Sequence, residues 1–260
     1  MRPLTLLARA EAPRPVGVVF DLDDTALDHG RLTEPALAAL YRARAAGLRL
    51  VAATGRPAGW AEVFARVLPI DGAVAENGAV AYYRDGARVR STEPEGRGPA
   101  REALLPLAAE LCAAFGCRLA DDNGLRRSDV TVDVGETERV PPETVAAMGR
   151  WASERGLRTT VSSVHLHLTR SPDDKASGVL RFLGERFGDD PSSARARYAF
   201  VGDSGNDAAC FAAFPLSVGV ANVAPYLPRL SVPPRYVARE ERGRGFAEAL
   251  DAFLALSPAG

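Results

Sequence analysis

Cysteine, methionine and tryptophan are scarce in this 260-residue sequence, which contains three, two and two of them. The cysteines, Cys112, Cys117 and Cys210, form no Cys-x-x-Cys pair and have no histidine-rich spacing beside them, so the sequence predicts no zinc site. We expect free thiols in a protein of the reducing cytoplasm. With two tryptophans, no aromatic platform for stacking a sugar can be named.

The charge balance gives no excess of positive charge. The net charge is -1 and the isoelectric point is near 6.3, so no overall positive field attracts nucleic acid or an anionic membrane. The stretch 242–245, Arg-Gly-Arg-Gly, has too few basic and aromatic neighbours to indicate RNA binding, and we expect a loop before the last helix. These features favour a small-molecule partner and leave the oligomeric state open.

Long apolar runs do not occur near the amino terminus. Residues 1–15 contain an apolar stretch that is too short for a signal peptide or a membrane span. We expect a loose leader there. The sequence therefore predicts no membrane partner.

The remaining composition, 47% hydrophobic and 25% charged residues, is typical of a globular protein with a substantial core. Apolar runs alternate with helical patterns near both ends of the chain, which is the order expected for a parallel α/β sheet. The runs expected to form buried strands are 16–20, 48–53, 72–75, 198–202 and 216–220, and the helical patterns are 34–46 and 175–187.

The middle of the chain has a different pattern. Asp85-Gly86 separates two short strand-like segments and predicts a hairpin. Beyond it are helical patterns at 101–115 and 142–155 and strand patterns at 129–134, 157–161 and 164–168. The sequence therefore predicts an α/β fold with a Rossmann-like parallel-sheet core, residues 1–78 and 169–260, and an inserted α+β cap domain, residues 79–168.

Two groups of aspartates follow directly after predicted strands. Asp21 begins the segment Asp21-Leu22-Asp23-Asp24-Thr25, and Asp203 begins the segment Asp203-Ser204-Gly205-Asn206-Asp207. Carboxylates gathered at the ends of buried strands repel each other unless a cation neutralises them. Oxygen ligands suit Mg²⁺ better than zinc or copper, so we expect a magnesium site.

Four polar side chains adjoin the carboxyl ends of the predicted core strands: Asp21, Thr54, Lys175 and Asp203. In an open α/β sheet these ends meet at one edge and bind ligands. Lys175, Thr54 and backbone N–H groups near Gly55 and Asn206 would neutralise a phosphoryl group. A carboxylate such as that of Asp21 is a competent nucleophile toward phosphorus when a metal screens its charge.

These segments resemble the haloacid dehalogenase superfamily, whose pattern is Asp-x-Asp-x-Thr, then Thr or Ser, then Lys, then Gly-Asp-x-x-x-Asp. All four parts occur in that order, and the resemblance covers residues 16–56 and 171–220. Glu76-Asn77-Gly78-Ala79, followed by a large insert, resembles subgroup IIB, whose cap is of the C2B type. Capped relatives of this kind include sucrose-phosphate phosphatase and mannosyl-phosphoglycerate phosphatase.

The resemblance implies roles for individual residues. Asp21 is expected to be the nucleophile and a metal ligand, and Asp23 the general acid and base, with its backbone carbonyl on the metal. Asp203 matches the other metal carboxylate, and Asp207 is expected to support the metal directly or through water. The side chains implied to hold the phosphate are those of Thr54 and Lys175.

Four further residues are candidates for substrate contact. Arg56 lies beside Thr54 and is a candidate for contact with the substrate or the cap. Asn77 belongs either to a hinge turn or to the ligand site. His165 and His167 share one face of a predicted strand, and because no third ligand is evident we interpret them as leaving-group contacts rather than as a metal site. Two more polar residues alternate with apolar ones in the same way: Thr131 and Asp133.

The sequence thus predicts a magnesium-dependent phosphatase that hydrolyses a small phosphorylated metabolite through an aspartyl-phosphate. A sugar phosphate is the first candidate for the substrate. Two alternatives remain. A sugar phosphomutase of the same superfamily would share the aspartyl-phosphate step and return the phosphate to the sugar, and a noncatalytic module would only bind phosphate.

Overall fold

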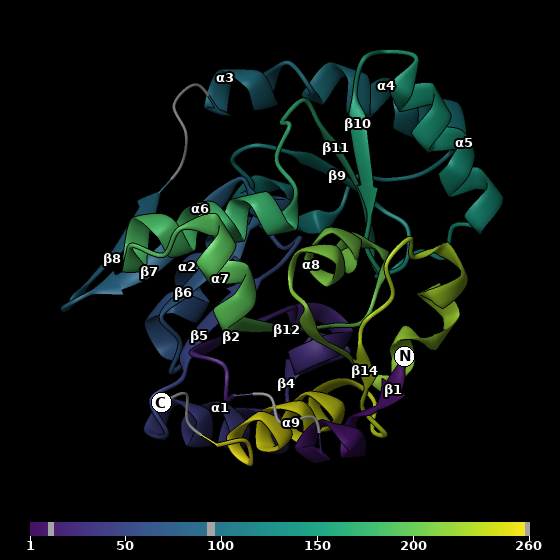
Figure 1. Cartoon of the computed structure of the whole chain (residues 1–260). Coiled ribbons are helices and arrows are strands. Elements are labelled where there is room, and N and C mark those ends of the chain that lie inside the picture. The colour runs from purple at the N-terminus through teal and green to yellow at the C-terminus, as the bar shows by residue number, and fades with distance from the viewer. Residues whose placement is uncertain (10–12, 93–96, 258–260) are drawn as a thin grey trace.

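A nine-stranded sheet forms the centre of the computed structural model, which describes residues 1–9, 13–92 and 97–257 (Figure 1). The spatial order of its strands is β1 (Arg2–Pro3), β14 (Tyr236–Val237), β13 (Leu216–Gly219), β12 (Tyr198–Gly202), β2 (Gly17–Phe20), β5 (Arg49–Ala53), β6 (Gly72–Ala75), β7 (Val80–Asp85) and β8 (Arg88–Thr92). Neighbours pair in parallel except at one edge, where β7 and β8 are antiparallel.

Helices cover both faces of this sheet, and the central strands bury side chains on each. In β2, Val18 and Phe20 pack on one face and Val19 packs on the other. Such two-sided burial explains the continuous apolar runs in the sequence. The first face is covered by α1 (Glu34–Ala45), α2 (Ala58–Val67) and α9 (Arg242–Leu254), and the second by α6 (Lys175–Phe187), α7 (Pro191–Arg197) and α8 (Ala208–Ala213).

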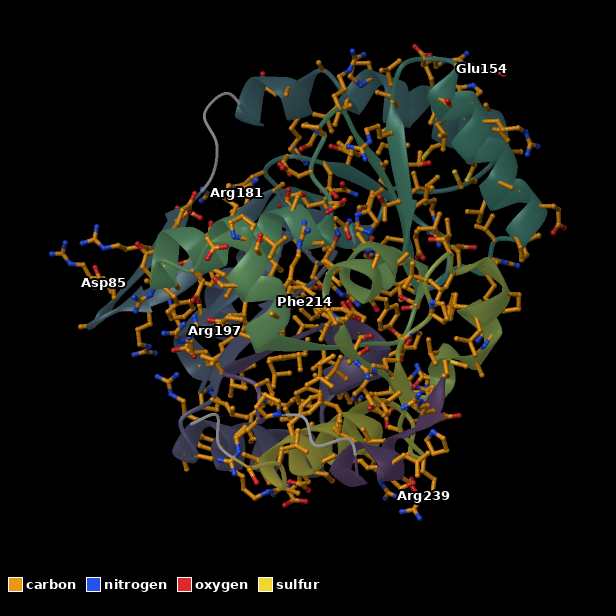
Figure 2. All side chains as sticks on the ribbon, in the orientation of Figure 1. Asp85, Glu154, Arg181, Arg197, Phe214 and Arg239 are labelled. Carbon is orange, nitrogen blue, oxygen red and sulfur yellow. The ribbon has the colours of Figure 1, made fainter. Side chains whose placement is uncertain are left out.

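Side-chain packing and capping fix the positions of these helices. Phe214 is fully buried and stacks on Phe200, whereas the side chains of Asp85, Glu154 and Arg239 project from the surface (Figure 2). Helix α6 begins at a capping box, in which the Asp174 carboxylate accepts a hydrogen bond from the Ser177 N–H and the Ser177 hydroxyl accepts one from the Asp174 N–H. This N-terminal capping box fixes Lys175 as the first residue of α6.

A three-stranded antiparallel sheet lies above the central sheet in Figure 1, in the order β10 (Arg158–Val161), β11 (His165–Thr169), β9 (Val130–Asp133). Its apolar face packs against α4 (Leu105–Phe115) and α5 (Pro142–Ser153), and a short helix, α3 (Arg97–Glu102), precedes them. We call the small sheet and these helices the cap. The opposite face of the small sheet carries the polar side chains of Thr131, Asp133, His165 and His167.

The predicted fold class is confirmed: a large, mostly parallel α/β sheet carries an inserted α+β cap. The segments 175–187 and 198–202 have the predicted bounds, and the hairpin at Asp85-Gly86 forms between β7 and β8. This hairpin was expected to start the cap, but its first strand pairs with β6 of the central sheet. A second, minor hairpin joins β3 (Leu27–Asp28) to β4 (Arg31–Leu32).

Two local expectations are wrong. The leader is docked, because β1 pairs with β14 and the side chains of Leu4 and Leu7 are buried in the core, while residues 10–12 lie outside the described segments. The stretch 242–245 is the first turn of α9 and not a loop. A Cβ atom at Gly243 would lie 2.5 Å from Oγ1 of Thr33, so this glycine allows close helix packing.

Across 1–9, 13–92 and 97–257, no helix combines the length and the apolar character needed to span a membrane.

Candidate active site

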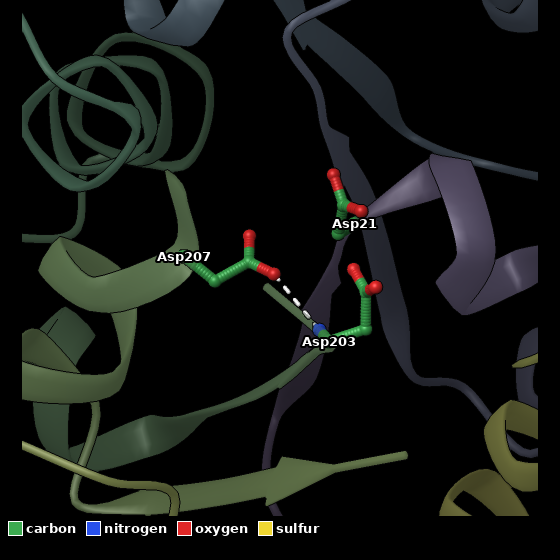
Figure 3. Close-up of side chains that lie close together, drawn as sticks. All are labelled: Asp21, Asp203 and Asp207. Carbon is green, nitrogen blue, oxygen red and sulfur yellow. Dashed lines mark hydrogen bonds between the residues drawn. The ribbon is translucent and has the colours of Figure 1, made fainter. Parts of the chain in front are cut away.

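The carboxyl ends of β2 and β12 bring three buried aspartates together (Figure 3). Asp21 follows β2 directly, and Asp203 follows β12. Asp207 lies one short helical turn after Asp203. Each of the three offers a carboxylate oxygen within 4.8 Å of the others. Two sequence segments that are 178 or more residues apart along the chain therefore form one acidic site.

Lys175 joins this acidic site from the first turn of α6. Its Nζ donates hydrogen bonds to Oδ1 of Asp21 at 2.8 Å and to Oδ1 of Asp207 at 2.6 Å. The Lys175 side chain is 0% exposed. Burial lowers the pKa of this amine, but Asp207 and Asp21 outweigh burial and leave the pKa raised. Lys175 is therefore a buried cation that bridges two carboxylates.

Asp207 is oriented by the backbone of its own loop. Its Oδ2 accepts hydrogen bonds from the N–H groups of Asp203 at 2.9 Å and Ser204 at 3.1 Å. Gly202 makes this approach possible, since a Cβ atom there would lie 2.5 Å from Oδ2 of Asp207. With both oxygens engaged, Asp207 is better placed to orient Lys175 and the Asp203 loop than to act as a direct metal ligand.

Asp203 is held by two side chains for which the sequence predicted no role. Thr25 donates its hydroxyl to Oδ1 of Asp203 at 3.3 Å, and Asn222 donates its amide to Oδ2 at 3.1 Å. The same Asn222 amide also donates to the carbonyl of Asp24, whose backbone is left-handed at φ 55°. These bonds lock the loop after β2 to the loop after β12.

The electrostatics of the aspartates indicate a cation site. Burial raises the pKa of Asp21 to about 8, against the opposing effect of Lys175, and burial together with Asp21 raises the pKa of Asp203 well above its ordinary value. Ionising all three carboxylates in a buried site therefore requires more positive charge than Lys175 supplies. The donor set is all oxygen, and it fits a hard divalent cation such as Mg²⁺.

The loop after β5 presents the predicted phosphate contacts. Thr54 is fully buried, and its Oγ1 accepts a hydrogen bond from the N–H of Arg56 at 3.0 Å, so its hydroxyl hydrogen is directed elsewhere. Gly55 lines a small cavity together with Asp21 and Asn206. The Oδ1 of Asn206 accepts from the Ser204 hydroxyl. The structure thus brings Gly55, Lys175 and Asn206 around Asp21, and Thr54 follows β5, the strand that pairs with β2.

Asp23 and Arg56 form a tight ion pair beside Asp21. Nε and Nη2 of Arg56 donate to the Asp23 carboxylate at 2.9 to 3.0 Å. Nη1 donates to Oε1 of Glu136, in the cap, at 2.9 Å. Oε2 of Glu136 lies 2.9 Å from Nε2 of His165. The hydrogen bond to His165 and the charge of Arg56 lower the pKa of Glu136 to about 2. Arg56 therefore contacts both the proposed acid and base and the cap.

His167 belongs to a different, buried cluster behind Gly55. Its Nδ1 lies 2.8 Å from Asp129, which also receives two hydrogen bonds from Arg126. Burial raises the pKa of Asp129, but Arg126 and His167 outweigh this effect and lower it to about 2. Nη1 of Arg126 also donates to the Gly55 carbonyl at 3.0 Å. This cluster ties the cap to the phosphate loop.

The turn after β6 holds a second contact between cap and core. Glu76 is buried and left-handed at φ 50°. Its carboxylate accepts hydrogen bonds from the N–H groups of Ala58, Arg127 and Ser128 and from the Ser128 hydroxyl. Asn77 follows with φ 52°, and its backbone N–H donates to the Thr54 carbonyl. Asn77 is thus part of the turn, and it lines neither cavity beside Asp23.

Two cavities lie between the core and the cap. The smaller, of about 10 Å³, adjoins Asp21 and is closed by the cap residues 162–165. The larger, of about 640 Å³, is lined by Asp23 and Arg56 of the core and by Glu136 and Ser163 of the cap. Two further arginines line it, Arg139 and Arg242. His165 adjoins the smaller cavity, and His167 lines neither.

Known proteins resemble this chain in sequence. The family model described as haloacid dehalogenase-like hydrolase matches residues 18–94. A phosphoglycolate phosphatase of Metallosphaera sedula is 30% identical over 84% of this chain and 88% of the relative. A phosphoglycolate phosphatase of Pyrobaculum neutrophilum is 31% identical over 91% of this chain and 95% of the relative.

Solved structures are similar over nearly the whole chain. Protein 0175 of Thermoplasma acidophilum has a TM-score of 0.73 at 20% identity, covering 94% of this chain and 100% of that one. The sucrose-phosphatase of Synechocystis sp. PCC6803, in complex with sucrose and phosphate, has a TM-score of 0.60 at 18% identity, covering 92% and 98%. At these identities the likeness supports the fold alone. One of these structures, the sucrose-phosphatase, is of the kind named above among the capped relatives that the sequence resembles.

Proposed function

Because this chain belongs to the haloacid dehalogenase-like hydrolases and is a phosphatase, we propose that it hydrolyses a small phosphomonoester with Mg²⁺ through an aspartyl-phosphate on Asp21. The observation that carries the proposal is the fully buried Lys175 held between Asp21 and Asp207, with Asp203 beside them. A buried cation among three carboxylates at strand ends is an arrangement suited to a phosphoryl group and a metal ion.

In the first proposed step, a carboxylate oxygen of Asp21 attacks phosphorus while the bond from phosphorus to the leaving oxygen breaks. Asp23 gives its proton to that leaving oxygen. Lys175 uses two of its three N–H groups for carboxylates, and we assign the third to a phosphate oxygen. The Thr54 hydroxyl and the backbone of Gly55 donate to the remaining phosphate oxygens.

In the second step, Asp23 takes a proton from water, and the water oxygen attacks the phosphorus bound to Asp21. The bond between Asp21 and phosphorus breaks, so inorganic phosphate leaves and the Asp21 carboxylate is restored. Mg²⁺ held by Asp21, Asp203 and the Asp23 carbonyl, with Asp207 supporting the site, would neutralise charge on the phosphoryl group.

For the substrate, we propose 2-phosphoglycolate as the first candidate, because the two curated relatives carry the name phosphoglycolate phosphatase. Three arginines line the larger cavity, of which Arg56 and Arg242 already pair with the lining carboxylates of Asp23, Glu136 and Asp24. Arg139, which forms no ion pair within the described residues, is the arginine available to an anionic leaving group. The volume of about 640 Å³ also admits larger groups, so a sugar phosphate stays the second candidate. The cytoplasmic location expected from the free cysteines stays a prediction.

For the domains, we propose a cap of residues 97–169 in place of 79–168, because β7 and β8 pair with the central sheet. The cavity of about 10 Å³ beside Asp21 is too small for a phosphate group. The two cavities share Asp23, Arg56, Ser163 and Val164 in their linings, so we propose that residues 162–165 of the cap shift to join them when substrate enters.

The test is phosphate release from a panel of 2-phosphoglycolate, sugar phosphates and nucleotides, with Mg²⁺ and with a chelator. We expect metal-dependent release in the wild type and none from Asp21→Asn, which keeps the size of the side chain. Acid quenching with ³²P-labelled substrate should trap labelled wild-type protein and leave Asp21→Asn unlabelled. Turnover by Asp21→Asn would refute the proposed nucleophile, and phosphate moving between positions of a sugar without release would indicate the mutase.

A further inference from the structure

We propose that Glu136 of the cap is a positioning residue for Asp23, acting through Arg56, so that the acid and base of the core is correctly oriented only with the cap in place. The inference rests on the proposed function, since that assigns the proton transfers to Asp23. It concerns a loop residue outside the four segments that resemble the superfamily pattern.

Arg56 connects Asp23 of the core with Glu136 of the cap. Nε and Nη2, on one edge of its guanidinium, donate hydrogen bonds to the Asp23 carboxylate, and the third nitrogen, Nη1, donates to Glu136. The guanidinium is planar and its donors have fixed directions. A restraint on Nη1 therefore fixes the edge that holds Asp23. Trp60 of α2 adds a second restraint, with the Arg56 guanidinium 4.5 Å from its ring centroid.

The loop that carries Glu136 is fixed by hydrogen bonds to Asp133. The Asp133 carboxylate accepts hydrogen bonds from the consecutive N–H groups of Gly135, Glu136 and Thr137 at 2.9 to 3.1 Å. The Glu136 side chain, although 36% exposed, is braced by His165, which is 1% exposed. The hydrogen bonds of the loop and the contact with the buried His165 therefore hold the Glu136 carboxylate in one position, facing Arg56.

The position of Asp23 decides whether a proton can reach the leaving oxygen. Asp23 lines the larger cavity, where the leaving group is placed by the proposed function. A general acid must come within hydrogen-bond distance of the atom that it protonates. Misplacement of a catalytic group by about 1 Å can lower the rate roughly 10²-fold. Loss of the Glu136 contact leaves Nη1 with Asp122, whose Oδ2 is 3.7 Å away, as its nearest carboxylate. The Arg56 guanidinium, still stacked on Trp60, can then turn toward Asp122, and the bound Asp23 carboxylate moves with it.

The test uses leaving groups that differ in their need for a proton. For each variant, kcat/KM is measured with 2-phosphoglycolate, whose alkoxide leaving group needs protonation, and with p-nitrophenyl phosphate, whose leaving group does not. The ratio kcat/KM reports only steps up to transfer of the phosphoryl group to Asp21. We expect Glu136→Gln to lower kcat/KM about tenfold for 2-phosphoglycolate, the alkyl ester, and about twofold or less for p-nitrophenyl phosphate, the aryl ester. The tenfold loss is smaller than the roughly 10²- to 10⁴-fold contribution of a general acid, because Asp23 itself is still present.

Three variants give controls. Glu138→Gln removes a surface carboxylate two residues away, paired with the exposed Arg118, and should change neither value. Glu136→Asp keeps the charge and should restore part of the alkyl activity. His165→Gln removes the brace and leaves the carboxylate, so it should act in the same direction as Glu136→Gln with a smaller effect, and it serves as the second probe if Glu136→Gln folds poorly.

Two results would overturn the inference. Equal losses for both esters would indicate a structural or binding role for Glu136. A further loss of alkyl activity when Glu136→Gln is added to Asp23→Asn would show that Glu136 does not act through Asp23, because residues that act through one another are not additive. Failure of the proposed function is separate from both, since it would appear as turnover by Asp21→Asn.

Discussion

Replacing Lys175 by methionine tests whether the buried cation holds the acidic site together. The side chain of methionine is nearly as long as that of lysine but has no charge. In the wild type, Nζ bonds to Asp21 and Asp207 with no exposure to solvent. The substitution leaves Asp21, Asp203 and Asp207 as neighbouring buried carboxylates without their cation.

The expected loss of stability follows from the cost of breaking a buried ion pair from one side, about 3–5 kcal/mol. Proton uptake limits this loss, because burial already raises the pKa of Asp21 to about 8 and the substitution favours its neutral form further. For a protein of this size, 1 kcal/mol corresponds to about 2–4 °C in Tm, so we expect Tm to fall by about 6–20 °C in the presence of a chelator.

The assay is thermal unfolding followed by circular dichroism at pH 7, with EDTA and with Mg²⁺. The added cation should raise Tm more in Lys175→Met than in the wild type, because it takes over the neutralising role of the amine. Arg244→Met, an exposed position in α9, is the control and should shift stability by about 0.5 kcal/mol or less. An unchanged Tm in EDTA for a folded Lys175→Met would refute the reasoning.

Three further outcomes are expected. The pKa of Asp129 in the folded protein, about 2, lies below its ordinary 3.8. The ionised Asp129 therefore contributes about 2–3 kcal/mol to the free energy of unfolding above pH 4, and this contribution is lost as the pH falls toward 2. In urea unfolding at pH 3 and pH 6, Asp129→Asn should lack this part of the pH dependence. Asn222→Ala should weaken Mg²⁺ affinity about tenfold, by releasing Asp203, and a Mg²⁺ titration of Tm that matches the wild type would contradict this. Asp203→Ala should lower both the rate and the response to Mg²⁺; an unchanged metal response would remove Asp203 from the ligand set.

Elements whose signals are local could be predicted from the sequence. The helix 175–187 has its capping residues and its terminating glycine, Gly188, in adjacent positions, and its bounds agree with the structure. The residues Asp21 and Asp203 were predicted to meet because both follow buried strands, and β2 and β12 are indeed neighbours. The rule that parallel strands end at one edge was sufficient for this part of the site.

Contacts that depend on packing between distant segments could not be predicted. Glu136 meets Arg56 across 80 residues, and Asn222 meets Asp24 across 198, with no spacing or composition that marks either. The alternation in β11 placed His165 and His167 on one face, but the packing of the cap on the core decides that His165 adjoins the cavity while His167 pairs with Asp129.

Lys175 is also the only lysine in the chain, which otherwise carries 31 arginines as its basic residues. Within these 260 residues, an acylating or reductive-methylation reagent therefore meets a single side-chain amine, Nζ of Lys175. This amine is shielded from solvent and kept protonated by Asp207 and Asp21, so it is unreactive while the site is intact. The fraction of molecules labelled at Lys175 consequently reports how often the acidic site has opened during the reaction.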